Sequence, residues 1–132
     1  MKISLIVFAL FVSASWLGGC AVLVDKGTEG SADATVAEID AVSKLSFASE
    51  RQEGYERIAL REGLAARAQV RLVDAILDNL AHDSAKQEVL LTLIANPNFS
   101  SAAERKIQGQ INKLAFESTK KRILQAISDR KT

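Results

Sequence analysis

The feature that most constrains the fold is a short phrase that occurs three times, at intervals of 35 and 34 residues. The phrase runs leucine, small residue, aromatic ring, any residue, serine, any residue, base. Its three copies are Leu45–Arg51, Leu80–Lys86 and Leu114–Lys120. Self-similarity at this period is typical of stacked supersecondary units, none of which can bury its apolar face alone. We therefore expect consecutive units that stack on one another.

The residues between the copies favour helices. From Thr35 onward, alanine, leucine, glutamate, lysine, arginine and glutamine dominate, and Pro97 is the only proline. Apolar residues recur three and four positions apart, which is typical of one stripe of an amphipathic helix. The clearest stripes are Val73-Ile76-Leu77-Leu80, Leu90-Leu93-Ile94 and Ile107-Ile111-Leu114. Alternating runs, which would indicate strands, are absent from the sequence.

The repeated serine stands where a helix N-cap is expected. Ser49 and Ser84 are each followed three residues later by glutamine, which is the spacing of a capping box. Ser118 is the third predicted cap. Ser101 and Glu104 have the same spacing within the second unit, as do Thr35 and Glu38 in the leading segment. The rings before the three repeated serines are expected to act as hydrophobic staples: Phe47, His82 and Phe116.

These signals predict an all-α domain of stacked helical hairpins. The chain holds about two and a half repeats of 34–35 residues, or about five helices. Residues 35–45 form the leading half and residues 119–129 the trailing helix. Because residues 35–132 number about 98, we expect one domain with one modest core. Residues 20–34, rich in small polar residues and glycine, are expected to form a flexible tether.

The second half of the chain resembles the family catalogued as domain of unknown function 4476. That family shows the rhythm Ser-Phe-Asp-Ser-Ser-Lys at a helix start, a short turn with an aromatic residue, another helix and the same phrase again. Residues Leu80–Leu124 carry this rhythm, with Asn98-Phe99-Ser100 at the turn and Phe116–Lys120 as the second phrase. The resemblance implies helical repeats and brings no assigned activity, so no catalytic residue carries over.

The N-terminus resembles a bacterial lipoprotein signal peptide. Lys2 is followed by an uncharged apolar stretch at 3–16 and then by Leu17-Gly18-Gly19-Cys20. The stretch is shorter than the roughly 20 residues that a membrane-spanning helix needs. The resemblance implies cleavage between Gly19 and Cys20, removal of residues 1–19, a diacylglycerol on the sulfur of Cys20 and an acyl chain on its amine. This covalent lipid is the only cofactor-like group that we expect.

A lipid on Cys20 would hold the protein to a membrane of the bacterial cell envelope. The absence of aspartate after Cys20 favours the outer membrane, facing the periplasm, in a Gram-negative cell. Without Lys2, 16 lysines and arginines balance 16 aspartates and glutamates, so the mature chain has no net side-chain charge. Cys20 is the only cysteine, so a disulfide cannot stabilise this fold.

No residue pattern indicates catalysis or a metal. His82 is the only histidine, and it occupies the ring position of the repeated phrase. A zinc site needs further histidine or cysteine ligands. The serines stand at expected caps, and neither a Gly-x-Ser-x-Gly motif nor a phosphate-binding loop occurs. An enzyme would require a cleft that gathers His82 with Asp83 and Glu88. We expect no catalytic residue, no metal and no small-molecule substrate.

Charge is distributed unevenly. Residues 25–56 carry eight acids and three bases, whereas residues 104–132 carry three acids and eight bases. One interpretation is a basic surface, formed by Lys113, Lys120, Lys121 and Arg122, that meets an anionic partner such as lipid head groups or cell-wall polymer. The alternative is that these charges complement acids on neighbouring helices. Nucleic acid is not expected as a partner of an exported chain.

Two functions fit these observations. The first is a non-enzymatic protein-binding or scaffolding module at the envelope, since helical repeats often present extended binding surfaces. The alternative is an envelope inhibitor or immunity-type lipoprotein that blocks a lytic enzyme or toxin. Both predict an envelope protein as the partner and neither requires catalytic residues.

Overall fold

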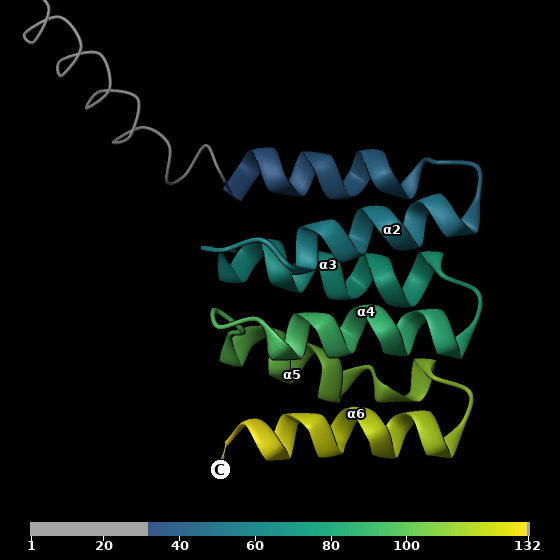
Figure 1. Ribbon diagram of the computed structural model, residues 1–132, viewed down its shortest axis with the longest axis vertical. Coiled ribbons are helices and arrows are strands. Elements are labelled where there is room, and N and C mark those ends of the chain that lie inside the picture. The colour runs from purple at the N-terminus through teal and green to yellow at the C-terminus, as the bar shows by residue number, and fades with distance from the viewer. Residues whose placement is uncertain (1–31, 132) are drawn as a thin grey trace, which may run out of the picture. The chain divides into compact units, whose positions relative to one another are not determined.

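The computed structural model describes residues 32–131. The expected signal segment 1–19, Cys20 and the tether up to residue 31 lie outside these residues. Within the described part, the chain contains helices and turns and no strand (Figure 1). The prediction of an all-α fold is therefore confirmed. Residues 32–34, which the sequence placed in the tether, are helical.

The helices follow the predicted repeat. A helix over residues 32–43 is followed by α2 (Ala48–Ala59), α3 (Ala66–Asn79), α4 (Asp83–Ala95), α5 (Ser101–Gly109), the 3-10 helix η1 (Ile111–Lys113) and α6 (Glu117–Arg130). The starts of α2, α4 and α6 are separated by 35 and 34 residues, as are the copies of the phrase. Residues 32–131 thus contain six α-helices, which form a leading helix, two full hairpins and a trailing helix. This is one more than the expected count of about five.

The helices form two layers. In one layer α4 lies between α2 and α6 and contacts both, and in the other α3 contacts α5 (Figure 1). The helix over residues 32–43 is joined to α3 by ion pairs from Arg67 to Asp33 and from Arg71 to Asp40. Every second helix of the chain therefore lies in the same layer, which is the arrangement expected of stacked hairpins.

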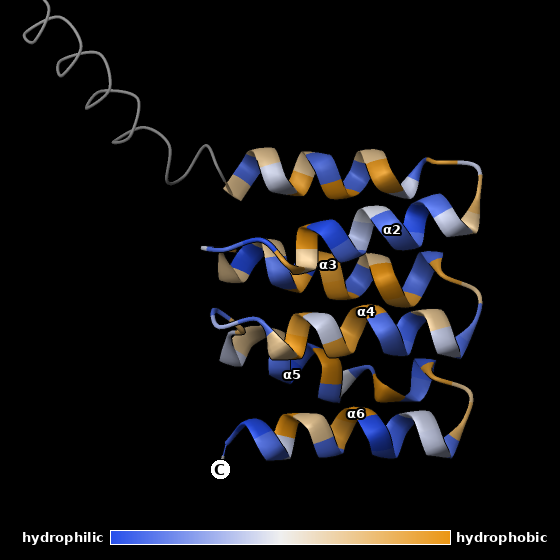
Figure 2. Cartoon of the chain, in the orientation of Figure 1, coloured by the Kyte–Doolittle hydropathy of each residue, from blue (hydrophilic) through white to orange (hydrophobic). Residues whose placement is uncertain are grey.

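The core lies between the two layers. Figure 2 shows apolar residues concentrated on α3 and α4, the helices with neighbours on most sides. The largest fully buried apolar side chains come from every hairpin: Ile39, Tyr55, Ile58, Leu72, Ile76, Leu90, Leu93, Ile107, Leu114 and Ile123. Burying one such aliphatic side chain contributes about 1.5–3 kcal/mol. Stacking is therefore the main source of stability for these short helices.

The predicted serine caps are wrong. Ser49, Ser84 and Ser118 are each the second residue of their helix, and the ring residue before them occupies the N-cap position without a side-chain cap. In the later helix the cap is Ser100, whose hydroxyl accepts from the Ala103 N–H at 3.1 Å, and Ser101 is already helical. Thr35 likewise lies inside a helix. Tertiary bonds to the preceding turns help to position the starts of α4 and α6, from Arg51 to Asn79 and from Asp83 to Phe116.

The predicted staples are wrong as well. Phe47 and Phe116 are 66% and 64% exposed, and His82 is also exposed. Each ring lies in extended backbone in the turn before its helix, and the three turns lie at the same end of the stack (Figure 1). The leucine two residues before the ring is buried in the second and third copies, at Leu80 and Leu114, whereas Leu45 in the first copy is 37% exposed.

The base of the repeated phrase joins the first helix of each full hairpin to the end of the second arm of the same hairpin. Arg51 donates to the carbonyl oxygen of Asn79 at 3.1 Å, and Lys86, one repeat later, donates to that of Lys113 at 3.5 Å. Asn79 and Lys113 both end the second helix of a hairpin and are 34 residues apart. A cation at the C-terminus of a helix satisfies carbonyl groups that have no partner within the helix. The repeated base is therefore structural.

An equivalent bond stabilises the other end of the stack. The Asn96 side chain donates to the carbonyl oxygens of Ala59 and Arg61 at 2.7 and 3.0 Å, beyond the last turn of α2. Arg130, 34 residues later, donates to the carbonyl oxygen of Ile94 at 3.1 Å, at the end of α4. Asn96 thus caps α2 from the end of α4, and Arg130 caps α4 from the end of α6.

Candidate functional site: the groove between α4 and α6

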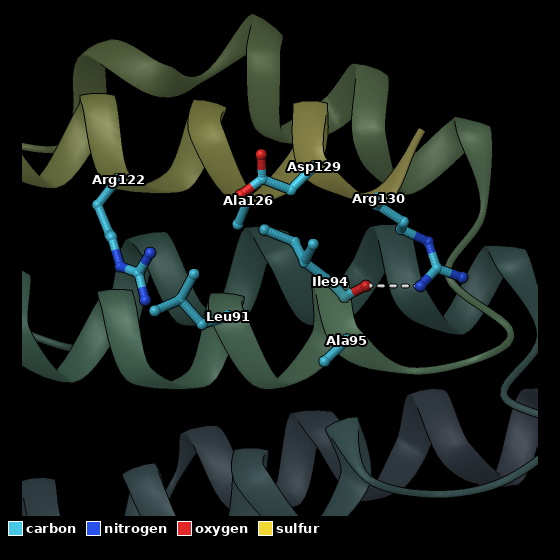
Figure 3. Close-up of a pocket in the computed structure, with 7 residues that line it drawn as sticks. All are labelled: Leu91, Ile94, Ala95, Arg122, Ala126, Asp129 and Arg130. Atoms are coloured by element: carbon cyan, nitrogen blue, oxygen red, sulfur yellow. Dashed lines mark hydrogen bonds between the residues drawn. The ribbon is translucent and has the colours of Figure 1, made fainter. Parts of the chain in front are cut away.

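An open hollow lies between α4 and α6 on the surface of the stack (Figure 3). Its volume is about 350 Å³. We call it the α4–α6 groove, and it is lined by Leu91, Ile94, Ala95, Arg122, Ala126, Asp129 and Arg130. Its floor is aliphatic and its charged groups lie on α6.

The groove lies at the edge of the surface that the two helices bury, where buried Ile94 meets partly or fully exposed residues. The core faces carry Leu90 and Leu93 on α4 and Ile123 and Ile127 on α6. Residues next to these stripes lie at the boundary with solvent, and two of them are alanines, Ala95 and Ala126. Because an alanine side chain ends at Cβ, the space between the helices is left unfilled there. The groove is therefore a gap between packed helices rather than a cavity in the core.

Arg130 is held in a fixed position at one end of the groove. Its guanidinium group donates to the carbonyl oxygens of Ile94 and Pro97 at 3.1 and 3.2 Å. Its Cζ also lies 5.6 Å from the centre of the Phe99 ring. A cation over an aromatic face is attracted by the ring quadrupole. These contacts place a positive charge where α4 ends.

Arg122 lies at the opposite end of the groove (Figure 3). It is exposed, and no ion pair joins it to another residue in the range 32–131. Eight residues separate Arg122 from Arg130 on α6, which corresponds to about 12 Å along the helix axis. Ala126 lies midway between them on the same side of the helix. The groove therefore has a cation at each end and an apolar centre.

Asp129 is the one acid at the groove. Gln125 donates a hydrogen bond to its carboxylate at 2.7 Å, and the carboxylate points away from α4 (Figure 3). This negative charge next to Ala126 and Arg130 would repel an acidic group placed near the middle of the groove. The two ends are the positions at which an anion would be favoured.

The structure does not gather the four bases predicted as a binding surface. Lys113 pairs with Asp78 at 2.6 Å and Lys120 with Glu117 at 2.9 Å. Lys121 is exposed, and only Arg122 lines the groove. Consecutive helical residues point about 100° apart, so residues 120–122 cannot share one face. For Lys113, the structure favours the alternative interpretation, in which bases complement acids of neighbouring helices.

Two further ion pairs follow the same pattern. Lys106 on α5 pairs with Asp74 on α3 at 3.1 Å, and Lys131 pairs with Glu104 at 2.7 Å. The hydrogen bond from Lys120 lowers the pKa of Glu117 below its ordinary value. Four of the eight bases at 104–132 are thus ion-paired within the stack. Arg122 differs from these bases because its charge faces the groove.

The residues that an enzymatic site would require are engaged elsewhere. The Asp83 carboxylate accepts from the backbone N–H groups of Ala115 and Phe116 at 2.9 and 2.8 Å. Glu88 accepts from the Gln52 amide at 2.7 Å. His82 is exposed at the N-cap of α4. The structure does not bring these three side chains together around a cleft.

A second hollow of about 280 Å³ lies between α2 and α4 and shares Ala95 with the α4–α6 groove. It is lined by Ala59, Leu60, Thr92, Ala95, Asn96 and Pro97. Leu60 is 69% exposed at its edge. The two hollows together extend across the surface of three neighbouring helices. Neither of them was predicted from the sequence. The one sequence signal that could have suggested the α4–α6 groove is the spacing of Arg122, Ala126 and Arg130.

Neither metal-binding nor membrane-spanning elements occur among residues 32–131. No group of three or more histidine, cysteine, aspartate or glutamate side chains there could hold a metal ion. No helix in this range is long and apolar enough to cross a membrane. No family model, curated protein or solved structure matches the chain.

Proposed function

We propose that this protein is a lipid-anchored lipoprotein of the bacterial envelope whose helical stack binds another protein without catalysing a reaction. The lipobox-like sequence ending at Cys20 supports the anchor. The stack of repeated hairpins supports a binding role, because such stacks present continuous surfaces built from successive units. The tether between Cys20 and residue 32 would let the stack meet partners away from the bilayer.

The α4–α6 groove is the observation that carries this proposal. Its aliphatic floor and its two arginines combine the two features that peptide-binding grooves use: apolar burial for affinity and charge for orientation. Arg130 is already ordered by α4, so binding at that end requires no further loss of side-chain freedom. A small apolar hollow with a cation at each end, one of them ordered, fits a partner side chain better than it fits a reaction.

The groove alone is small for a protein interface. A stable complex buries about 800 Å² on each partner. The hollow between α2 and α4 adjoins the groove through Ala95, and exposed Leu60 adds apolar area beside it. A partner that covers both hollows would lie across α2, α4 and α6. We therefore assign the binding surface to the outer side of this layer.

The anchor is tested by intact mass. The chain extracted from native membranes with detergent should begin at Cys20 and carry added acyl mass, and a Cys20→Ser variant should carry none. An unprocessed or unlipidated wild-type chain would refute the envelope assignment and return cytoplasmic proteins to the list of partners.

The binding role is tested by site-specific crosslinking in cells. A photo-crosslinking residue at Ala95, where the two hollows meet, should yield one defined adduct. The same residue at Ala37, exposed on the helix over residues 32–43, serves as the control. If every surface position, Ala95 included, yields no adduct in the organism of origin, the binding role is wrong.

A further inference from the structure

We infer that the α4–α6 groove recognises an α-helix of its partner that carries two carboxylates eight residues apart and an aliphatic side chain midway between them. This inference rests on the proposed function, because it specifies the partner segment of the same surface. It commits to a helix with acid, aliphatic and acid residues at positions i, i+4 and i+8. The observations that carry it are the spacing of the arginines, the aliphatic floor and the position of Asp129.

The spacing of the cations matches a helical ligand. Arg122, Ala126 and Arg130 stand at i, i+4 and i+8, so they form one stripe along α6. A partner helix lying along the groove has the same rise per residue as α6. Carboxylates at i and i+8 of that helix would therefore also be about 12 Å apart and would meet both guanidinium groups. An arginine binds a carboxylate through two parallel N–H groups, which fixes orientation as well as position.

The floor of the groove accommodates the central side chain. Leu91 and Ile94 contribute aliphatic surface from α4, and Ala126 leaves room above it from α6. A leucine or isoleucine at i+4 would enter the gap between the two alanines of the groove. Burial of that side chain would favour binding by the hydrophobic effect, offset in part by the costs of association.

Asp129 gives the groove its selectivity. Its carboxylate lies beside Ala126, on the side of the groove that faces away from α4 (Figure 3). An acid at i+4 of the partner would meet this charge and lose the apolar floor. Acids at the two ends avoid Asp129 and meet arginines. The groove therefore discriminates between helices of the same net charge by where their acids stand, which is specificity by repulsion as well as attraction.

A helix fits this geometry better than an anionic membrane surface does. Lipid head groups attract cations that stand out together from a surface, and their attraction does not depend on an apolar hollow between the cations. Here Arg130 is bonded to carbonyl groups of Ile94 and Pro97, close to the protein surface. The exposed Lys121 would serve a membrane equally well, although it lies outside the groove. Comparing Lys121 with Arg122 thus separates the two ligands.

The test uses the full chain in detergent and two synthetic helical peptides. One peptide is alanine-rich with glutamate at i and i+8 and leucine at i+4. The control peptide has the same composition but moves both glutamates by two residues, onto the opposite face. Calorimetric titration should show saturable binding of the first peptide and at least about tenfold weaker binding of the second, as expected for lost charge-assisted pairs.

Matched variants of the protein complete the test. Arg122→Gln should weaken the first peptide about tenfold, whereas Lys121→Gln, which removes the same charge from the neighbouring residue, should change its affinity less than about twofold. Ala95→Leu should fill the floor and abolish binding without a change in charge. Arg122 makes no ion pair within residues 32–131, so Arg122→Gln should unfold at the wild-type temperature, which excludes loss of folding as a cause.

Three results would overturn the inference. The first is equal affinity for the two peptides, and the second is an equal effect of Arg122→Gln and Lys121→Gln on the affinity for the first peptide. The third is the absence of saturable binding at peptide concentrations up to about 1 mM, at which a binding free energy near −4 kcal/mol would already be detected. Binding of phosphatidylglycerol vesicles that depends on Arg122, without peptide binding, would assign the groove to lipid instead. If a crosslinked partner is still captured by Arg122→Gln and Ala95→Leu chains, the groove inference is wrong and the proposed function stands.

Discussion

Replacing Asp83 by asparagine should weaken the packing of the trailing helix α6 on the α4–α5 hairpin more than any other change of a single charge. Asp83 is the first residue of α4 and is only 8% exposed. Its carboxylate accepts from the backbone N–H groups of Ala115 and Phe116, in the loop that leads into α6. Asparagine keeps the size of the side chain, removes the charge and turns an NH2 group toward one of the two donors.

The expected loss follows from these two bonds. A hydrogen bond to a charged group contributes about 1.5–3 kcal/mol, whereas a neutral one contributes about 1 kcal/mol. Asparagine can keep one neutral bond, and the loss of a negative charge at the start of α4 costs a further ~0.5 kcal/mol. The free energy of unfolding at pH 7 should therefore fall by about 2.5–5.5 kcal/mol. For a domain of this size, Tm should fall by at least about 10 °C.

The dependence on pH identifies the charge as the cause. Burial raises the pKa of Asp83, but the N–H groups of Phe116 and Ala115, helped by Lys86 and Lys120, lower it overall. A lowered pKa in the folded state means that the carboxylate stabilises the fold above its unfolded pKa of about 3.9 and loses this effect as the pH falls through the folded value. The difference between wild type and Asp83→Asn should therefore be full at pH 7 and shrink below about pH 4.

Urea unfolding followed by circular dichroism measures both effects. Glu117→Gln is the matched control, since Glu117 begins α6 as Asp83 begins α4 but has no following loop to bond. Its effect should be clearly smaller. The reasoning is refuted if Asp83→Asn costs less than about 0.5 kcal/mol at pH 7, within the range of ordinary surface changes. It is also refuted if the deficit persists unchanged in acid.

Three further substitutions test the packing. Gly54→Ala should destabilise the domain by about 1–3 kcal/mol, because a Cβ there would stand 2.7 Å from Val42 Cγ1. Gly109→Ala, which has open space around it, should be neutral or slightly stabilising. Thermal unfolding of the two variants distinguishes the effect of close packing from that of helix propensity. Asn96→Ala should lower the free energy of unfolding, measured by chemical denaturation, by about 1–3 kcal/mol, because it leaves the carbonyl groups of Ala59 and Arg61 without their donor. A variant in which α4 alone is destabilised would contradict this reason. Gly63→Ala should cost about 1–2 kcal/mol because its φ is +68°, and equal stability of Gly63→Ala and wild type would show that the turn adopts another conformation.

The fold could be predicted because its signals are periodic. The interval between the copies of the phrase is also the interval between the starts of α2, α4 and α6. Apolar stripes predicted from spacing, such as Leu90-Leu93-Ile94, are buried. Helical periodicity and repeat length are properties of the chain itself, so they survive without knowledge of its neighbours.

The errors share one cause. Serine, ring and base recur together, and local rules assigned the serine to a cap and the ring to a staple and gave the base no role. In the structure the serine is inside the helix, the ring of Phe47 or Phe116 is exposed, and the base Arg51 bonds the carbonyl group at the end of another helix. The role of the base depends on which carbonyl group lies opposite it, and for Arg51 that group belongs to Asn79, 28 positions away in the chain.

The sequence by itself therefore determined the helical class, the repeat length and the positions of the buried stripes, because these depend on periodicities within a single helix or unit. Only the tertiary structure decided how the hairpins are joined and where the surface is hollowed. The α4–α6 groove exists because Ala95 and Ala126, from different helices, face the same gap, and because Arg130 is fixed by carbonyl groups of α4 and its following turn. Such a juxtaposition is set by the packing of two helices and leaves no periodic signal in either one.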